Sequence, residues 1–193
     1  NRQDLTQDEK DAAKAKVTEA EKTAKQAVED AADQNAVTQA KTNGTSTIAG
    51  ITPEAKVRPD AIKEVEAAAE AKKREITDNK ELTAEEQAKA IQAVTDAVQN
   101  ARNAINGSDT NALVGTAKEA GLSAIRAIQG EAKSKPAALA AVAQAAETKK
   151  QGIERNAALT SDEKAEAVRK VNEELAKAQQ AIKDAANDEA VTN

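Results

Sequence analysis

The stretch LTAEEQAKAIQAV at residues 82–94 decides the fold of this chain. It begins with Thr83, and Glu86 follows three residues later. This pair is a capping box, in which the threonine oxygen accepts a bond from an early backbone N–H and the glutamate reaches back to the threonine N–H. The same box recurs 77 residues before and after this one: Thr6 with Glu9, and Thr160 with Glu163. The pattern therefore predicts three equivalent α-helices at a fixed interval.

The 77-residue spacing extends over the rest of the chain without a gap. Apolar, glycine and proline positions all recur at that spacing. Examples are Val17 with Val94 and Val171, Gly44 with Gly121, Ile48 with Ile125, and Pro59 with Pro136. Self-similarity at a fixed period is typical of an array of structural units, so we expect tandem repeats.

Each repeat is expected to hold three helices. The first begins at the capping threonine, and in the second repeat it ends at Gly107, where glycine suits the left-handed residue that closes many helices. Its apolar residues follow a 3-4 spacing that is typical of a narrow packing stripe. They are Ile91, Val94, Val98, Ala101 and Ile105. In the first repeat Lys14 and Glu21 replace two stripe residues, so this helix is expected to pack less tightly.

The second helix of each repeat is expected to begin at a capping residue and to pass close to its neighbour. The caps are Asp33, Thr110 and Asn187. Gly44 and Gly121 recur inside this helix, which indicates a close helix–helix approach because glycine is otherwise unfavourable there. Before this helix, Asp30 and Asp184 replace the glycine, which leaves either a turn or a kink open.

The third helix is expected to begin at Pro59 or Pro136, because proline loses no hydrogen bond at a helix start. Leu82 and Leu159 follow this helix just before the next cap and are expected to cover the end of the bundle. Three antiparallel helices place the entry and the exit of a unit at opposite ends. The predicted fold is therefore all-α, with tandem three-helix bundles forming an elongated rod.

Two divisions of the chain into units are open. The first has repeats at 5–81 and 82–158 with a partial repeat at 159–193. The second has units at 59–135 and 136–193 and places the longest loop at the unit boundary. We favour the second, because linkers between units tend to be long and rich in proline.

The composition predicts a folded but thin core. The 193 residues include 47 Ala and only 29 Ile, Leu and Val, with no aromatic residue, Cys, Met or His. The net charge of −5 is too small for strong self-repulsion, and the large aliphatic residues lie at helical spacing. Because Met is absent, we expect the sequence to be an internal segment of a longer chain. No apolar stretch approaches the roughly 20 residues that span a bilayer, so no membrane association is expected.

The sequence predicts no catalytic site, metal site or cofactor site. Without His, Cys or Tyr, neither a Ser-His-Asp nor a Cys-His arrangement is possible, so we expect no enzyme and no catalytic residue. Paired acids such as Asp8 with Glu9 and Glu85 with Glu86 are interpreted as partners of the positive helix end. Asp30 and Asp33 are interpreted as solvated surface, and no loop has calcium-site spacing, so no metal site and no cofactor is expected.

The densest basic points are Lys72-Lys73-Arg74 and Lys149-Lys150. They lie late in the third helix, where cations oppose the negative helix end, and the stems of Lys72 and Lys149 are expected to cover apolar surface. The chain offers no aromatic residue for base stacking, so we expect no nucleic-acid partner.

Several spaced motifs together resemble a known family. They are LT followed by an acid and Glu at a helix start, the A-x-x-A-I segment at 101–105, the A-x-x-x-G-x-x-x-I segment at 117–125, and the segment from Ile128 to Pro136. The chain resembles the helical domain-of-unknown-function repeats of staphylococcal cell-wall-anchored surface proteins, the group that includes SasC and Mrp/FmtB. The resemblance implies long tandem arrays between an adhesive region and a wall anchor, and it supplies no catalytic or ligand residue.

The expected function is a structural spacer on the bacterial cell surface, outside the cell, that holds an adhesive domain away from the wall. Its expected partners are neighbouring repeats of the same chain. The alternative is a binding module for a host extracellular protein or for the same repeat on another cell, as in a biofilm. The absence of aromatic residues counts against that alternative, because interface hot spots favour Trp, Tyr and Arg.

Overall fold

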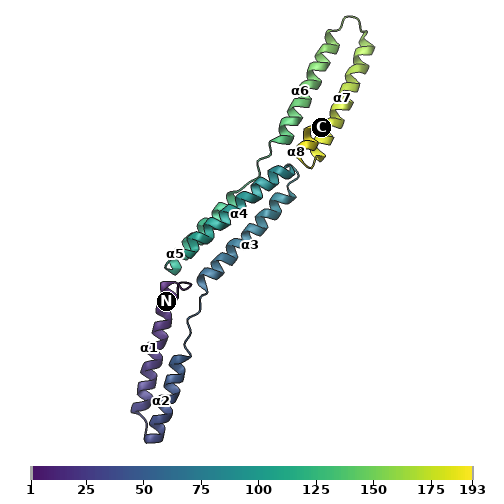
Figure 1. Ribbon diagram of the computed structural model, residues 1–193. Coiled ribbons are helices and arrows are strands. Elements are labelled where there is room, and N and C mark those ends of the chain that lie inside the picture. Colours follow the sequence, from purple (N-terminus) through teal and green to yellow (C-terminus); the bar gives the residue numbers. More distant parts are fainter. Residues whose placement is uncertain (1, 193) are drawn as a thin grey trace. The chain divides into compact units, whose positions relative to one another are not determined.

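The computed structural model describes residues 2–192, which form eight α-helices and no strand (Figure 1). The helices are α1 (Gln7–Glu29), α2 (Gln34–Ala49), α3 (Val57–Asp78), α4 (Ala84–Asn106), α5 (Asn111–Ala127), α6 (Ser134–Arg155), α7 (Ser161–Asp184) and α8 (Asp188–Thr192). The all-α prediction is confirmed. The starts of α1, α4 and α7 and those of α3 and α6 follow the period of the sequence.

The predicted capping boxes are present. Thr6 precedes α1, and its side chain accepts from the backbone N–H of Glu9 while the Glu9 carboxylate accepts from the Thr6 backbone N–H. Thr160 and Glu163 make the same two bonds before α7. The three capping residues predicted for the second helix of each repeat are also confirmed. Their side chains accept from the N–H three residues on: Asp33 from Ala36, Thr110 from Leu113, and Asn187 from Ala190.

Gly107 does not take the left-handed conformation that we predicted, because no described glycine has a positive φ. The α4 helix instead ends through Ser108. The Ser108 backbone N–H donates to the Ile105 carbonyl at 3.2 Å and its hydroxyl donates to the Ala104 carbonyl at 2.8 Å. These two bonds satisfy late helix carbonyls without a left-handed residue.

The first repeat has a full turn between its first two helices, which excludes the kink. The α1 helix ends at Glu29 and α2 begins at Gln34, after the Asp33 cap. The prolines also differ from the prediction. Pro59 and Pro136 are each the third residue of their helix and not the first. Proline is tolerated there because none of the first four N–H groups of a helix has an intrahelical partner.

The chain divides into two compact units whose boundaries fall inside α3, α4 and α5. The first unit contains 1–68 and 97–124, and the second contains 69–96 and 125–193. The first unit therefore holds all of α1 and α2, the second holds all of α6, α7 and α8, and each contains a part of α3, α4 and α5.

In the first unit, α1 and α2 are antiparallel neighbours, and parts of α3, α4 and α5 pack together (Figure 1). The two predicted close approaches are confirmed. A Cβ atom on Gly44 would lie 2.5 Å from the Ala24 Cβ, and one on Gly121 would lie 2.5 Å from the Ala101 Cβ. Val65 of α3 is fully buried beside Gly121.

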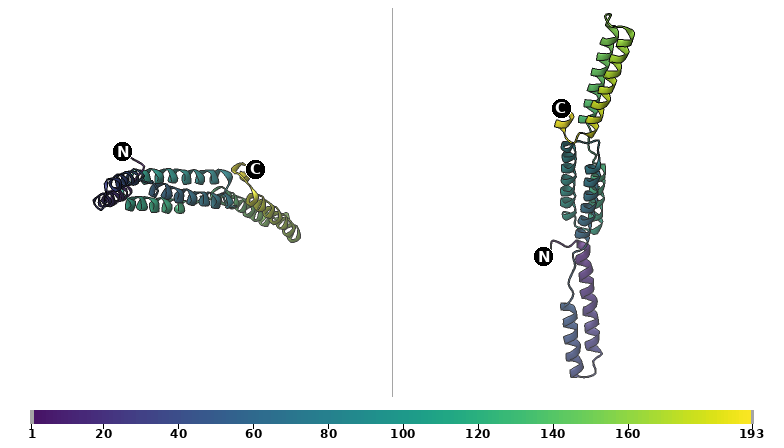
Figure 2. Two further views of the ribbon diagram at one scale, coloured as in Figure 1. Left: turned by 90° about the horizontal axis from the view of Figure 1, so that it is seen from below. Right: turned by 90° about the vertical axis from the view of Figure 1, so that its right-hand side faces the viewer.

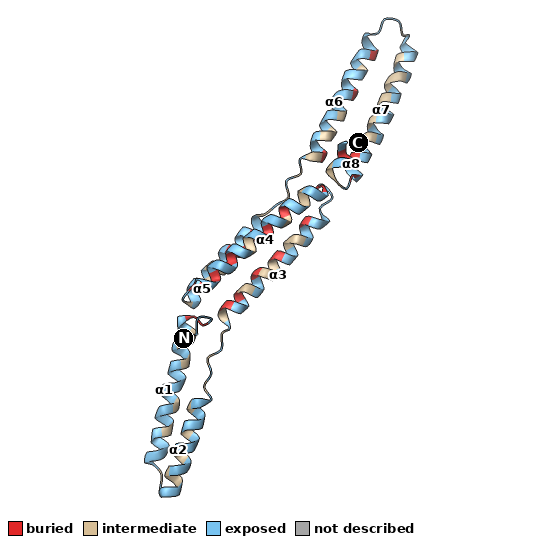
Figure 3. Ribbon diagram, in the orientation of Figure 1, coloured by how far each residue is buried: buried red, intermediate tan, exposed pale blue. Residues whose placement is uncertain are grey.

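Burial differs sharply between the α1–α2 pair and the helices α3, α4 and α5. Neither α1 nor α2 contains a buried residue, whereas α3, α4 and α5 carry most of the core (Figure 3). This agrees with the prediction that the interrupted stripe of α1 packs less tightly.

In the second unit, α6 and α7 run antiparallel through a short turn, and the short α8 lies against them (Figure 2). Its core contains Ile182, Ala185 and Val191. Leu139 and Val142 of α6 pack against this cluster. The aliphatic residues that the period aligns thus contribute to the core in this unit as well.

Candidate functional site: a polar joint between repeats

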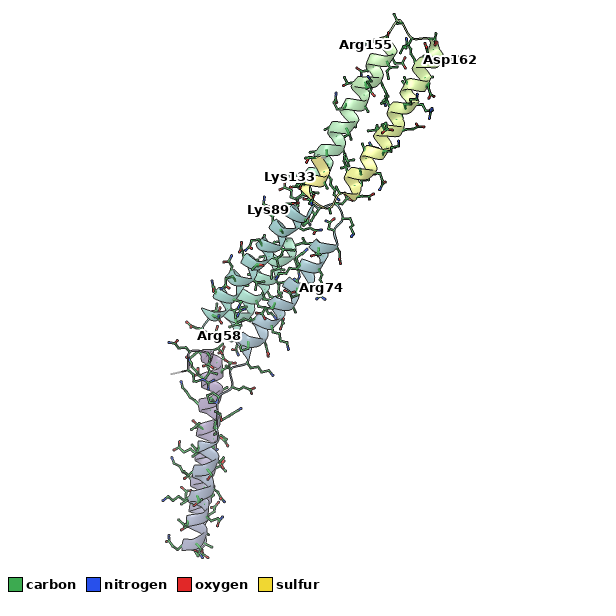
Figure 4. The ribbon with its side chains drawn as sticks, turned by 45° about the vertical axis from the view of Figure 1, so that its right-hand side comes forward. Arg58, Arg74, Lys89, Lys133, Arg155 and Asp162 are labelled. Atoms are coloured by element: carbon green, nitrogen blue, oxygen red, sulfur yellow. The ribbon has the colours of Figure 1, made fainter. Side chains whose placement is uncertain are left out.

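Each unit contains one recurring polar cluster, which we call a joint. In the first joint the start of α1 meets the start of α3 and the α4–α5 turn. In the second joint the start of α4 meets the start of α6 and the α7–α8 turn. Figure 4 labels Arg58 at the first joint and Lys133 at the second.

A single carboxylate caps two helices in the first joint. Glu9 Oε2 accepts from the Thr6 backbone N–H at 2.8 Å, which is the capping box of α1. Glu9 Oε1 accepts from the backbone N–H groups of Lys56 and Val57 at 2.8 and 2.9 Å. These two groups begin α3, and the N–H groups at a helix start have no partner inside the helix. Glu9 therefore joins two consecutive helix starts through one side chain.

Glu86 makes the same connection in the second joint. Its carboxylate accepts from the Thr83 N–H at 3.0 Å and from the N–H groups of Lys133 and Ser134 at 2.7 and 2.9 Å. Partial desolvation raises the pKa of Glu86, but these N–H groups lower it by more, to about 2. The pKa of Glu9 is also lowered, because the bonds from Val57, Lys56 and Thr6 outweigh desolvation. Both carboxylates are therefore held ionised.

The third copy of this glutamate lies in no joint within the described chain. Glu163 accepts from the backbone N–H and the hydroxyl of Thr160, both at 2.8 Å. These bonds lower its pKa, the backbone bond most strongly. Arg155 and Asp162 mark this exposed turn between α6 and α7 in Figure 4. Glu163 thus shows what the capping box does alone, without the start of a second helix.

A buried cation is the second component of each joint. Arg58, which is 7% exposed, donates through Nη2 and Nε to the Ser108 carbonyl at 2.6 and 3.2 Å, and through Nη1 to the Gln3 carbonyl at 2.6 Å. The Ser108 carbonyl lies at the end of α4, where the helix dipole is negative. A buried guanidinium is stable here because carbonyl oxygens replace its water.

Lys135 takes the place of Arg58 in the second joint, 77 residues later. It is 5% exposed, and its Nζ donates to the carbonyl oxygens of Lys80 and Lys183, each at 2.8 Å. Lys80 is the residue equivalent to Gln3, and Lys183 lies at the end of α7. A cation thus ties the segment before one helix to the end of another in both joints.

The first-turn acids bind across the joint as well. Asp8 Oδ2 accepts from the Asn111 backbone N–H at 2.6 Å, so it caps the start of α5. Glu85 Oε2 accepts from the Asp188 backbone N–H at 3.0 Å in the equivalent position. The sequence predicted that these acids stabilise the positive end of their own helix. In the structure each also accepts a hydrogen bond from a backbone N–H of the next repeat.

The backbone closes each joint directly. The Gln7 N–H donates to the Asp109 carbonyl at 2.7 Å, and the Ala84 N–H donates to the Ala186 carbonyl at 2.9 Å. A leucine directly precedes each capping threonine. Leu5 and Leu82 are buried, which confirms the prediction for Leu82, whereas Leu159 is only half-buried.

Two sets of residues that the sequence singled out lie away from the joints. Asp33 caps α2 and Asp30 accepts from the Gln26 side chain, so the two acids serve separate bonds. Lys72 is largely covered and pairs with Glu75 at 3.0 Å, as expected for a stem lying on apolar surface, whereas Lys149 is exposed. Among residues 2–192 no three acidic side chains are close enough to share a metal ion.

Sequence reasoning missed Arg58 and Lys135 as functional residues. Their signal was a basic residue at the same point of two repeats, one position before each proline. That signal is weak, because single surface lysines and arginines are common on helices.

A family model covers the whole chain. It matches in three consecutive segments, residues 1–56, 57–133 and 134–193, and its description is Domain of Unknown Function (DUF1542). The chain belongs to the DUF1542 family. The second and third DUF1542 segments begin at 57 and 134, where α3 and α6 begin. No curated protein and no solved structure matches the chain.

The DUF1542 match confirms tandem repeats of a helical domain of unknown function. The attribution to staphylococcal cell-wall proteins stays a prediction of the sequence, as does the choice between the two divisions into units. None of the described helices is both long and apolar enough to span a membrane.

Proposed function

We propose that these DUF1542 repeats form a non-enzymatic stalk of a bacterial surface protein, which holds an adhesive domain away from the cell wall. The recurrence of the joint carries this proposal. Both joints within residues 2–192 use a carboxylate that caps two helices, a buried cation on two carbonyl oxygens, and one direct backbone bond. A spacer needs connections that fix direction, and a repeated bonded joint meets that need better than a flexible linker would.

Joined in this way, successive repeats add length. A helix of about 23 residues is ~35 Å long, so each repeat is expected to add a distance of that order. Small-angle scattering on chains of one, two and three repeats tests this. The maximum dimension is expected to grow nearly linearly with repeat number, and a dimension that levels off would exclude the stalk.

The stiffness of the joint can be measured separately. The chain has no cysteine, so pairs of introduced cysteines can carry spin labels without background. Exposed Lys22 and Asn100 report on the first joint, and exposed Lys89 and Asn172 report on the second. Each pair is expected to give a narrow distance distribution. Arg58→Ala is expected to broaden the first distribution and leave the second unchanged. Broad distributions in the unsubstituted chain would contradict a stiff stalk.

A further inference from the structure

The dipeptide Asn106-Gly107 lies at the end of α4, directly before the turn that supplies the first joint. Asn106 is the last residue of α4, and both residues are exposed. The hydrogen bonds of the joint use the residues that follow, Ser108, Asp109 and Asn111. Asparagine followed by glycine is the pair at which a peptide chain most readily loses a side-chain amide, because glycine has no Cβ atom to hinder attack by its backbone nitrogen.

The equivalent pair in the second joint is Lys183-Asp184, and it is exposed as well. In that joint the end of α3 lies against α4, where Gln87 donates to the Thr77 and Asn79 carbonyl oxygens, both at 3.1 Å. The position is thus exposed even where the preceding helix is present. Since the second joint has no asparagine there, only the first joint contains the reactive pair, and the second is a control within the same chain.

The reaction at such a pair needs no partner other than water. The Gly107 backbone nitrogen gives its proton to hydroxide and forms a bond to Asn106 Cγ. The bond between Cγ and Nδ2 breaks, and the side-chain amide nitrogen takes up a proton and leaves as ammonia. Water then opens the resulting succinimide ring at either carbonyl carbon, which yields aspartate or isoaspartate.

The structure shows what restrains this reaction at Asn106. Ring closure requires the Gly107 N–H to leave the Asn103 carbonyl, to which it donates at 3.0 Å. Bonds at a helix end open more easily than those in its interior. The following residue is held more firmly, because Arg58 donates twice to the Ser108 carbonyl, at 2.6 and 3.2 Å. An intact joint is therefore expected to slow the reaction.

The chain contains a second Asn-Gly pair, Asn43-Gly44, in the interior of α2. A Cβ on Gly44 would lie 2.5 Å from the Ala24 Cβ, so the glycine packs closely against α1. The Asn43 carbonyl accepts from the Thr47 hydroxyl at 2.9 Å. Ring closure there requires α2 to open on both sides of the pair, which predicts a slower reaction than at Asn106.

We propose that Asn106 is a site of spontaneous deamidation, and that its conversion to isoaspartate loosens the first joint and spares the second. Isoaspartate lengthens the backbone by a carbon atom, because the chain then runs through Cβ and Cγ. It also places a carboxylate at the negative end of α4, which the helix dipole disfavours. Both changes act directly before Ser108 and Asp109. The carbonyl oxygens of these residues accept from Arg58 and from the Gln7 N–H.

Incubation of the full 193-residue chain at mildly alkaline pH, followed by tryptic digestion, tests the modification. Cleavage after lysine and arginine separates the two pairs into peptides 42–56 and 103–118. Fragmentation in the mass spectrometer locates the converted residue, and enzymatic methylation of isoaspartate quantifies it. Conversion at Asn106 is expected to be about tenfold faster than at Asn43. Conversion at neither residue, or conversion at Asn43 that is as fast or faster, would overturn the proposal.

Two substitutions change the rate in opposite directions. Gly107→Ala is expected to slow conversion of Asn106 about tenfold, because a Cβ hinders ring closure. Gly107 has no positive φ, so alanine is expected to be tolerated. Arg58→Ala is expected to accelerate conversion about tenfold, because it frees the Ser108 carbonyl. An unchanged rate in Arg58→Ala would show that the joint does not restrain the reaction, and would overturn its link to the joint.

Spin labels test the consequence for the joint. In the incubated chain the distance distribution between Lys22 and Asn100 is expected to broaden as isoaspartate accumulates, while that between Lys89 and Asn172 stays narrow. Incubated Gly107→Ala should keep both narrow. A first distribution that stays narrow in the converted chain would overturn the loosening, as would equal broadening of both.

Asn106→Asp is the matched control, since it adds the charge without lengthening the backbone. It is expected to broaden the first distribution less than conversion to isoaspartate does. Equal broadening would show that the longer backbone contributes nothing, and would overturn that part of the proposal.

Discussion

The two joints share one hydrogen-bond plan but differ in the side chains that carry it. Arg58 makes three bonds to two carbonyl oxygens in the first joint, and Lys135 makes two bonds to two carbonyl oxygens in the second. One acceptor is equivalent in the two joints, Gln3 and Lys80, whereas the acceptor at the helix end differs by two positions. Glu9 and Glu86, by contrast, make the same backbone bonds. The comparison shows that each joint uses a cation to donate to carbonyl oxygens and a carboxylate to accept from N–H groups. The type of cation, arginine or lysine, varies between the joints.

A second difference concerns the first residue of α5 and of α8. Asn111 Oδ1 accepts from the Thr6 hydroxyl at 2.7 Å in the first joint. Its equivalent in the second joint is Asp188, whose Oδ1 is buried and has no hydrogen-bond partner among residues 2–192. The first joint is thus the more completely satisfied of the two, and we expect it to be the more stable.

Arg58→Ala is expected to have the largest effect. It removes three bonds and leaves the carbonyl oxygens of Ser108 and Gln3 without their donor, at a cost of about 3 kcal/mol of local stability. Because arrays of repeats need not unfold in one step, amide hydrogen exchange is the suitable measurement. Exchange is expected to accelerate at the Val57 and Asn111 amides.

Arg58→Lys is the matched control, because it gives the first joint the cation of the second. It is expected to lose much less protection than Arg58→Ala. If the two substitutions had equal effects, the cation would contribute through its volume and not through its bonds to carbonyl oxygens.

Glu86→Ala is expected to have the next largest effect, about 2 kcal/mol, because it removes the carboxylate half of the α4 capping box together with the bonds to the start of α6. Glu163→Ala removes only the carboxylate half of a capping box, so its loss of stability should be clearly smaller. Urea denaturation followed by circular dichroism compares the two. Equal losses would mean that the bonds across the second joint contribute nothing.

Acid is expected to weaken both joints by less than the alanine substitution does, since a protonated carboxyl group still accepts hydrogen bonds. The pKa of Glu86 is about 2 in the folded chain against an ordinary value of 4.5, so the unfolded state binds more protons between these values. Its stabilisation is therefore present above about pH 4.5 and is lost as the pH falls toward 2. Thermal unfolding between pH 6 and 2 measures this, and the Glu86→Ala chain should show a flatter dependence over the same range.

Asp188→Asn is expected to have the smallest effect, and it should be favourable. It gives the second joint the amide of the first, so the Thr83 hydroxyl gains an uncharged acceptor and a buried carboxylate oxygen is removed. A gain of about 0.5 kcal/mol is expected. Asn111→Asp is the converse control in the first joint and should destabilise it. A loss of stability in Asp188→Asn would show that the unpartnered oxygen is not what separates the two joints.

Much of the fold followed from local chemistry. Thr83 with Glu86, Asp33 and Asn187 predicted helix starts correctly because a cap acts on N–H groups only three residues away. Gly44 and Gly121 predicted close approaches because only a missing Cβ tolerates them. Gly107 was wrong, since Ser108 closes that helix by bonds that glycine does not need.

The site was less predictable than the fold. The period alone aligned Glu9 with Glu86 and Arg58 with Lys135, but it did not show that these side chains reach another repeat. Asp8 and Glu85 were interpreted as serving their own helix, because a carboxylate in a first turn has that role by default. Their bonds to Asn111 and Asp188 join residues 103 positions apart, which no local pattern encodes.

The sequence by itself determined the helices, their starts and their 77-residue recurrence, because caps, stripes and close-packing glycines act over a few residues or along one helix face. Only the tertiary structure decided which carboxylate spans two helices and which cation is buried. Those properties depend on the order in which whole helices meet. A hydrogen bond between two repeats exists only where folding brings an unsatisfied N–H or carbonyl within about 3 Å of a side chain that its own helix has left free.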